Sequence, residues 1–437
     1  MNALILSAVF GVVMLFSGLW LKQKSAVRGV AIFGMIILLI VNVWEMYHPS
    51  FFPVNTAGMM AFDRFALLFN TIAIFSTLIF FILSARDMEK IGIHYGEFFA
   101  LIFFITCGII LVTAFKSLLI LFLGIEIISI PLYILTGSDK RNLRSNEASL
   151  KYFLMGSFST GLMLMGIALI YGATGTFSVA QMNFIAEKPG FLPVAGMMLL
   201  LFSMSFKVSA APFHFWTPDV YDGAPTVFTS FMATIVKAAI FIGFIRLFDE
   251  TFGQLHEQWK VWVAVITVAT LLIGNITAVF QQSVKRMLAY SSISQAGFML
   301  LALYALNTDA KEGILLYAAA YCLATIGIFA VLAKMNDYTF EGFNGLARQQ
   351  PLVAAVTTIL LLSLAGIPLT AGFLAKFYML KAALGNGSNL WLVIFAVLMA
   401  AISAYYYFRV IQAMYFKEGN ATIQSTPAFR WTLVGLA

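Results

Sequence analysis

Long hydrophobic runs dominate the chain, and short stretches between them hold most of the charged and turn-forming residues. Thirteen runs are centred near residues 12, 37, 75, 107, 126, 162, 200, 235, 272, 297, 323, 366 and 397, and a fourteenth begins at Trp431. About 20 apolar residues suffice for a helix to cross the hydrocarbon core of a bilayer. The pattern therefore predicts an all-α fold, a polytopic membrane protein of about 14 transmembrane helices.

Composition supports the membrane prediction, because 61% of the residues are hydrophobic and 10% are charged. A soluble domain carries about 25% charged residues. Cys107 and Cys322 both lie inside apolar runs, so we expect neither a disulfide framework nor a cysteine-ligated iron–sulfur or metal site. We therefore expect no redox centre and no cofactor on this chain.

The two ends of the sequence carry two further expectations. The segment 2–21 lacks a basic stretch before it and a small-residue cleavage site after it, which favours a retained helix over a signal peptide. The run from Trp431 reaches Ala437 after a handful of residues. We expect the chain as given to stop before its final helix does.

Basic residues fall unevenly between the runs, and this asymmetry predicts the orientation in the membrane. Connections after odd-numbered runs hold sixteen: Lys22, Lys24, Arg28, Arg86, Lys90, Lys140, Arg141, Arg144, Lys151, Lys285, Arg286, Lys334, Arg348, Arg409, Lys417 and Arg430. Connections after even-numbered runs hold seven: Arg64, Lys116, Lys188, Arg246, Lys260, Lys311 and Lys381. The odd connections are thus predicted to be cytoplasmic, with the N-terminus on the opposite side. Membrane insertion accounts for the net charge of +7, so no nucleic-acid partner is expected.

Four ionisable residues lie well inside apolar runs: Glu126, Lys207, Lys237 and Lys376. Each costs about 2.5 to 3.5 kcal/mol at the centre of a membrane helix, so we expect them to face one another or water. The lysines have an alternative, in which the long stem carries the ammonium to the interface. For Glu126 the alternative is a static hydrogen bond between helices.

Two of the runs are interrupted, one at Pro212 after Lys207 and one at Pro368 before Lys376. Backbone groups freed at membrane depth are tolerated where protein or a water-filled cavity receives them. The breaks are five runs apart, which indicates two repeats of five helices each. Because five crossings bring the chain to the other side of the membrane, the second repeat starts on the opposite side and is inverted. We predict N-terminal helices over 1–96, repeats over 97–250 and 251–417, and the start of a last helix over 418–437.

Burial disfavours the charged form of a lysine and a nearby carboxylate favours it, so a Lys–Glu pair that separates and rejoins can switch a proton. Polar side chains near the breaks can hold waters between such groups, and each is alternatively a helix-packing hydrogen bond. The set comprises Ser209, His214, Gln281, Gln282, Tyr290, Ser291, Ser292, Ser294 and Gln295. His214, close to the first break, is the strongest candidate for a proton relay.

Three stretches resemble motifs of the antiporter-like subunits of respiratory NADH:quinone oxidoreductase, complex I. They are 206–226 (FKVSAAPFHFWTPDVYDGAPT), 285–295 (KRMLAYSSISQ) and 366–373 (GIPLTAGF). Within that family, 147–153 (EASLKYF), 236–239 (VKAA) and the lysine at Lys376 resemble subunit N rather than subunits M or L. One departure is Gln295, where relatives often place a histidine, and this puts a relay at that position in doubt.

The resemblance implies a proton-channel subunit in which Glu126 and Lys207 form the separable pair, Lys237 is the central carrier and Lys376 the exit-side lysine. It also implies partners: subunit M, small membrane subunits and the lipid bilayer. FMN, iron–sulfur clusters and the quinone site are expected on partner subunits. The expected location is the bacterial inner membrane, multi-pass, with the N-terminus periplasmic.

Three alternative functions share parts of this pattern. A subunit of a multi-subunit sodium/proton antiporter would be driven by ion gradients, but beyond Glu126 the predicted membrane interior offers no carboxylate to help bind sodium. A subunit of a membrane-bound hydrogenase would have the same fold. A scaffold without transport is disfavoured by four buried charges and two broken helices.

Overall fold

The computed structural model describes residues 1–21, 23–52, 54–92, 94–182, 184, 190–385, 389–421 and 423–437. Lys22 and Lys188, used above to predict orientation, lie outside the described residues. In the described part the regular elements are helices, and extended backbone pairs only at isolated bridges. The all-α prediction is confirmed.

The chain divides into two compact units. The first unit consists of Met1–Phe81, Met88–Val208 and Val236–Trp262, and the second of Ile82–Asp87, Ser209–Ile235 and Val263–Ala437. The boundaries expected for the five-helix repeats, 97–250 and 251–417, remain a prediction.

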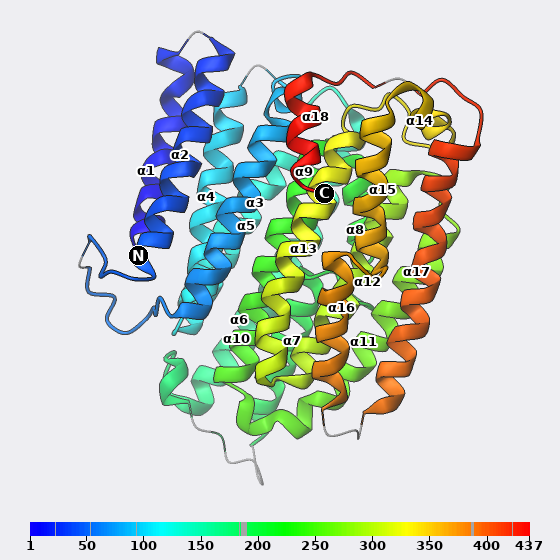
Figure 1. The fold of residues 1–437 in the computed structure, drawn as a ribbon. Coiled ribbons are helices and arrows are strands. Elements are labelled where there is room, and N and C mark those ends of the chain that lie inside the picture. Colours follow the sequence, from blue (N-terminus) through cyan, green and yellow to red (C-terminus); the bar gives the residue numbers. More distant parts are fainter. Residues whose placement is uncertain are drawn as a thin grey trace. The chain divides into compact units, whose positions relative to one another are not determined.

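Helices of the first unit are α1 (Asn2–Trp20), α2 (Lys24–Glu45), most of α3 (Arg64–Met88), α4 (Tyr95–Ala114), α5 (Leu118–Thr136), α6 (Leu143–Thr174), α7 (Phe191–Lys207), α10 (Lys237–Glu250), two 3₁₀ turns (Val179–Gln181, Gly253–Leu255) and the start of α11 (His256–Val279). Within this unit α1 packs against α2 and α4, and α4 packs against α5 (Figure 1). The α4 and α5 backbones approach closely at two glycines, Gly108 and Gly124. A Cβ at Gly108 would lie 2.7 Å from the Gly124 carbonyl oxygen, so only glycine allows this approach. Small residues of this kind are how membrane helices pack tightly.

Helices of the second unit are α8 (Trp216–Gly223), α9 (Thr226–Phe231), a π-helical turn (Met232–Val236), the rest of α11, α12 (Val284–Ala305), α13 (Thr308–Leu332), a 3₁₀ turn (Glu341–Phe343), α14 (Leu346–Gln349), α15 (Pro351–Ala365), α16 (Ala371–Leu384), α17 (Leu390–Phe416) and α18 (Pro427–Val434). Here α13 packs against α15 and α16, and α12 packs against α8 and α16. The two halves of the interrupted twelfth run, α15 and α16, therefore both lie against α13.

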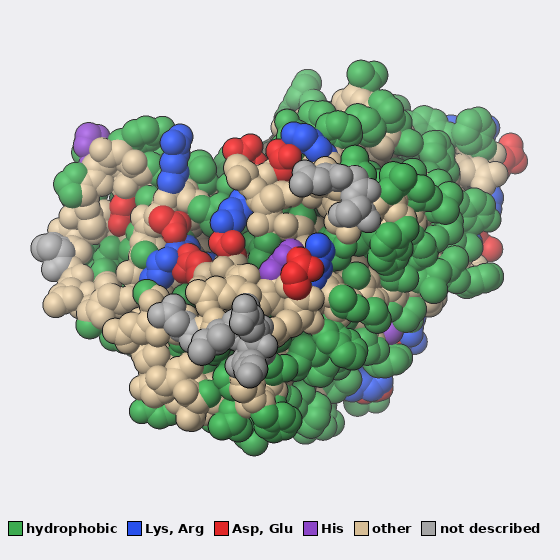
Figure 2. Space-filling view, turned by 90° about the horizontal axis from the view of Figure 1, so that it is seen from below, with side chains coloured by type: hydrophobic (Ala, Val, Ile, Leu, Met, Phe, Trp, Pro, Cys, Tyr) green, Lys and Arg blue, Asp and Glu red, His purple; other side chains and the backbone are tan. Residues whose placement is uncertain are grey.

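Among the described residues, 11 helices are long and apolar enough to cross a membrane, and α7 and α15 are shorter apolar helices. Many large hydrophobic side chains on them are exposed, for example Leu154 (57%) and Phe158 (69%) on α6. Hydrophobic surface of this extent on the sides of helices is stable against lipid rather than water. Figure 2 looks along the helices from below, and on this face charged side chains gather among the hydrophobic ones. The chain is a multi-pass membrane protein, and the expected total of about 14 spans remains a prediction.

Candidate functional site

Glu126 and Lys207 lie together inside the first unit. Glu126 is on α5, Lys207 is the last residue of α7, and the Lys207 Nζ is 4.0 Å from the Glu126 Oε1. The Thr160 hydroxyl on α6 joins them: it donates to Glu126 Oε1 at 2.8 Å and accepts from Lys207 Nζ at 3.3 Å. Lys207 also donates to the Ser129 hydroxyl at 3.0 Å. The expectation that these two charges would meet is confirmed.

Both charges of this pair are mostly enclosed by protein. The Lys207 side chain is 8% exposed and that of Glu126 is 22% exposed. Lys207 ends α7, where unpaired carbonyl groups favour a positive charge. In place of water, the ammonium thus has near it the end of α7, the hydroxyls of Ser129 and Thr160, and the Glu126 carboxylate.

The first helix break begins directly after Lys207. Ser209 takes a left-handed conformation with a φ of 64°, and the chain turns before α8 begins at Trp216. The free Ala211 N–H donates to the Thr270 hydroxyl of α11 at 2.9 Å, so protein receives a backbone group freed by the break. His214 lies in this turn, 5% exposed, and its Nδ1 has no hydrogen-bond partner among the described residues. A buried, unsatisfied ring nitrogen suits a water contact.

The second break separates α15 from α16. Gly366 has a φ of 80°, a conformation that glycine adopts without strain. Lys376 reaches back from α16 to this break, and its Nζ donates to the Ala365 carbonyl at 2.9 Å. A Cβ on Gly366 would lie 2.8 Å from the Lys376 Cδ. Glycine is favoured at this position by its backbone conformation, and any larger residue would also push against the lysine stem.

Lys237 is the first residue of α10 and follows directly after the π-helical turn Met232–Val236. Its side chain is buried, and the residue is 2% exposed. The residues of α10 from Lys237 to Phe248 are all buried. π-Helical turns occur often at functional sites. The hydropathy pattern located this run but gave no signal for the π turn, which inserts one residue without changing the composition.

The predicted residues are divided between the two units. Glu126, Lys207 and Lys237 belong to the first unit, and His214 and Lys376 belong to the second. Within the first unit the structure brings Glu126 and Lys207 into contact. On α12, Gln295 is buried and hydrogen-bonded, so the residue at the family's frequent histidine position does take part in a polar network.

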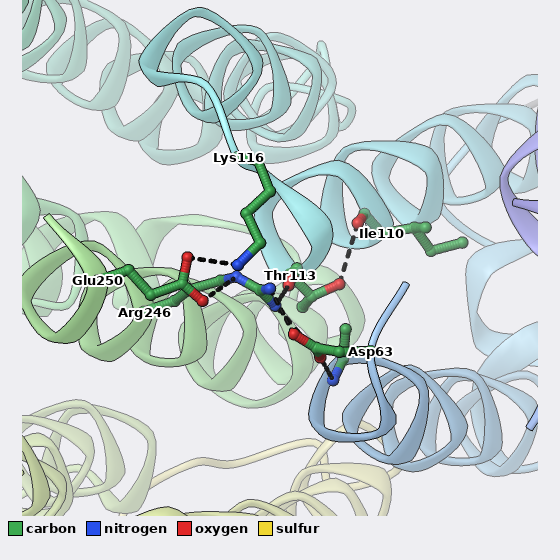
Figure 3. Close-up of polar contacts among 7 residues, drawn as sticks. Asp63, Ile110, Thr113, Lys116, Arg246 and Glu250 are labelled. Atoms are coloured by element: carbon green, nitrogen blue, oxygen red, sulfur yellow. Dashed lines mark hydrogen bonds and ion pairs between the residues drawn. The ribbon is translucent and has the colours of Figure 1, made fainter. Parts of the chain in front are cut away.

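Sequence reasoning missed a second ionic cluster in the first unit, centred on Arg246 (Figure 3). The charge pattern predicts Arg246 in a connection between helices, whereas it lies within α10 and is 3% exposed. Its guanidinium pairs with Asp63 at 2.5 Å, donates to the Thr113 carbonyl at 2.6 Å and lies 3.3 Å from Glu250. Lys116 pairs with Glu250 at 2.7 Å. Glu250 lies four residues after Arg246 on the same helix, a spacing at which side chains meet. Asp63 and Lys116 lie in segments far away in sequence, so the sequence gave no signal that they join the cluster.

Comparisons with known proteins agree with the motif resemblance. The family described as NADH:quinone oxidoreductase/Mrp antiporter, TM, matches residues 116–403. The chain is 41% identical to NADH-quinone oxidoreductase subunit N of Cytophaga hutchinsonii, over 100% of this chain and 95% of the relative. It is 38% identical to NADH-quinone oxidoreductase subunit N of Trichlorobacter lovleyi, over 95% of this chain and 87% of the relative.

A solved structure is also similar along nearly the whole length. It is a chain of respiratory complex I from Thermus thermophilus with bound aureothin, with a TM-score of 0.85 and 31% identity, covering 99% of this chain and 95% of that chain. The chain belongs to the family of antiporter-like membrane subunits of NADH:quinone oxidoreductase, in its subunit N group. The antiporter and hydrogenase alternatives have less support, because relatives over the full length carry the oxidoreductase name.

Proposed function

We propose that protons cross this subunit by way of Glu126, Lys207, Lys237 and Lys376, with His214 as a relay near the first break. The chain is a proton-translocating subunit of NADH:quinone oxidoreductase. The proposal is which residues carry the protons. Glu126 and Lys207 act as the switch, Lys237 as the central carrier and Lys376 as the exit-side carrier.

One observation carries the proposal: a carboxylate and an ammonium face each other across 4.0 Å inside the first unit, with the Thr160 hydroxyl between them. A buried pair in direct contact would be costly to break and would therefore stay in one arrangement. A longer pair with an intervening hydroxyl can open by a small side-chain movement. Lys207 then loses or regains the field of the carboxylate, and its affinity for a proton changes accordingly.

The energies involved are of comparable size. Moving one charge against a membrane potential of 100 mV costs about 2.3 kcal/mol. Two unit charges 4 Å apart attract by about 4 kcal/mol at an effective dielectric constant of 20. Opening and closing the Glu126–Lys207 pair therefore involves enough energy to drive one proton step.

Other parts of the complex supply the redox chemistry in this proposal. FMN, the iron–sulfur clusters and the quinone site belong to partner subunits, and antiporter-like subunit M and small membrane subunits are neighbours in the membrane arm. Cys107 and Cys322 are buried free thiols and are not ligands in this scheme. The location is the bacterial inner membrane with the N-terminus periplasmic.

We also infer the two inverted five-helix repeats, over 97–250 and 251–417. Supporting details occur at the start of α5 and of α12, which are the fifth and tenth runs. Leu118 N donates to the Phe177 carbonyl at 3.0 Å, and Val284 N donates to the Tyr338 carbonyl at 2.7 Å. The preceding residues, Ser117 and Ser283, each accept a capping hydrogen bond. The same local arrangement thus recurs in each unit.

Replacing Lys237 tests the proposed path. Lys237→Ala removes the proton-carrying group. Lys237→Arg keeps a positive group that does not release its proton at working pH. Both variants should assemble and should lower NADH-driven proton pumping by about a hundred-fold or more, the scale that a positioned proton-transfer group contributes. Acidification is measured in vesicles containing the purified complex, with quinone reduction and native-gel assembly measured alongside.

Lys381→Ala is the matched control, because Lys381 is a half-exposed lysine paired with Asp309 at 3.0 Å. It should pump normally. Normal pumping by Lys237→Ala would remove Lys237 from the path. Failure of both Lys237 variants to assemble would mean that the lysine serves the packing of α10.

A further inference from the structure

The short helix α8 ends without the backbone donors that a longer helix would supply. It covers eight residues after the first break, and Pro225, which has no N–H, follows two residues beyond its end. The last four carbonyls of a helix have no partners within it. The Tyr221 carbonyl, whose regular partner would be the missing N–H of Pro225, accepts from the Thr229 hydroxyl at 2.9 Å. At this buried end, side chains therefore take the place of backbone donors.

Lys285 supplies two more of these donors. It is the second residue of α12 and 3% exposed, and its Nζ donates to the Asp222 carbonyl at 2.8 Å and to the Ala224 carbonyl at 2.7 Å. A cation in the first turn of a helix is unfavourable for that helix, whereas a cation beside the C-terminal end of another helix is favourable. The position of Lys285 thus serves α8 rather than α12.

Tyr338 completes the arrangement on the side of α9. Its ring centre lies 5.4 Å from the Lys285 Nζ, within the range at which a ring attracts a cation. Its carbonyl accepts from Val284 N at 2.7 Å, and its hydroxyl accepts from the Thr226 hydroxyl at 3.0 Å. Thr226 is the first residue of α9. Lys285 and Tyr338 together therefore hold both sides of the turn between α8 and α9.

The neighbouring cation, Arg286, reaches α8 in a different way. Its guanidinium lies 3.0 Å from the Asp219 carboxylate and 3.9 Å from the Asp222 carboxylate. The three side chains are 36%, 40% and 32% exposed, and ion pairs in contact with solvent contribute little. Lys285 instead binds enclosed backbone carbonyls. Of the two adjacent basic residues, Lys285 is therefore the one that fixes the end of α8.

We propose that Lys285 is a positioning residue for proton translocation: its ammonium holds α8 and the turn into α9 in the arrangement that pumping requires. The segment that it holds, Ser209–Ile235, carries His214 and continues in sequence into Lys237. The inference rests on the proposed path, because these two residues are members of that path. Lys285 itself passes no proton in this role.

Pumping by assembled complexes is the first test. Lys285→Met keeps a long side chain and removes its donors, so NADH-driven acidification per assembled complex should fall roughly ten-fold, the scale of one hydrogen bond to a charged group. Lys285→Arg keeps donors for both carbonyls but does not release a proton, so it should restore pumping to within about three-fold of normal. A proton carrier would lose its function in both variants. Equal losses in both would therefore overturn the proposal.

Arg286→Met is the matched control, because it removes the neighbouring cation of the same helix and leaves both carbonyl bonds of Lys285 in place. It should pump at nearly the normal rate. If it lowers pumping as much as Lys285→Met does, the lost positive charge is responsible rather than the lost bonds to α8, and the proposal fails. Normal pumping per assembled complex by Lys285→Met would make the lysine a packing residue.

Cryo-electron microscopy of the whole complex in lipid nanodiscs separates this inference from the proposed path. In Lys285→Met, α8 and the His214 side chain should shift or lose definition while the rest of α12 stays in place, and an unmoved α8 would refute the positioning role. If Lys237→Ala pumps normally, the proposed path is wrong, and the position of α8 still decides the role of Lys285. If Lys237→Ala stops pumping while Lys285→Met pumps normally, the path stands and this inference alone is refuted.

Discussion

Thr160 is the residue on which the proposed switch depends most directly. Its one hydroxyl donates to Glu126 and accepts from Lys207, so a change of charge on either group changes a hydrogen bond to the same hydroxyl. The hydroxyl also lies 3.1 Å from the Gly156 carbonyl, which gives its hydrogen a second acceptor when the carboxylate is protonated. Such a hydroxyl can change its partner by rotation alone, without any movement of the helices.

Thr160→Val tests this role, because valine keeps the branched shape and removes the hydroxyl. Hydrogen bonds to charged groups contribute about 1.5 to 3 kcal/mol, so we expect pumping to fall roughly ten-fold or more while the complex still assembles. Acidification in vesicles and native gels are the measurements. Thr358→Val is the control, since the Thr358 hydroxyl donates to the Ala354 carbonyl of its own helix. Equal pumping by both variants would show that Thr160 is a packing residue.

Residues of the site differ in how far the sequence predicts them. Glu126, Lys207, Lys237 and Lys376 can be recognised because a charge in an apolar run is rare and costly. Thr160 cannot, because threonine is common in membrane helices and usually bonds to its own backbone. Its importance follows from the way α6 packs against α5 and α7, which hydropathy does not encode.

At the scale of elements, proline and glycine predict where helices break. Pro212 and Pro368 mark both interruptions, and the structure has α7 and α15 ending just before them, at Lys207 and Ala365. What the sequence did not predict is the receiving group for each break. Thr270 bonds the Ala211 N–H, and Lys376 bonds the Ala365 carbonyl, and both depend on tertiary contacts.

The ionic cluster around Arg246 also connects elements. It joins the end of α10 to Asp63 before α3, to Thr113 in α4 and to Lys116 between α4 and α5. Asp63 pairs with Arg246 and also caps α3, accepting from Ala66 N at 2.8 Å (Figure 3). Arg246→Leu would remove the cation from Asp63, whose side chain is 43% exposed, while Glu250 would keep its pair with Lys116. The variant also leaves the Thr113 carbonyl without its donor, and hydrogen bonds to charged groups contribute about 1.5 to 3 kcal/mol, so we expect the variant complex to dissociate at a lower temperature.

Arg348→Leu provides the comparison for that measurement. Arg348 lies 3.9 Å from Glu418, and both side chains are more than 70% exposed, at 75% and 88%. Exposed pairs contribute about 0 to 1 kcal/mol, so this variant should dissociate at nearly the normal temperature. The structural role of Arg246 would be refuted if its variant behaved like that of Arg348.

At the scale of the whole chain, hydropathy predicts which segments are in the membrane but not which of them form a compact unit. Residues Ser209–Ile235 belong to the second unit, although they follow α7 of the first unit directly in sequence. This segment contacts distant parts of the chain within the second unit, for example through the hydrogen bond from the Tyr321 hydroxyl to the Ala233 carbonyl. Such pairings leave no periodic signal in the sequence.

Orientation is the property of the whole chain that the distribution of basic residues predicts, and cysteine labelling can test it. The connection between α2 and α3 is predicted to be periplasmic, and that between α5 and α6 cytoplasmic. Val54→Cys and Lys140→Cys place a thiol in each, at exposed positions. The natural cysteines, Cys107 and Cys322, are buried and should not react.

A membrane-impermeant maleimide added to intact cells should therefore label Val54→Cys and leave Lys140→Cys unlabelled until the cells are broken. The physical reason is that lysine and arginine resist transfer across the membrane, so the connections rich in them stay on the side of synthesis. Labelled protein is detected by mass after purification of the complex. The reverse pattern would place the N-terminus in the cytoplasm. It would also reverse the direction in which Lys376 serves as the exit-side carrier, because the two sides of the proposed path would be exchanged.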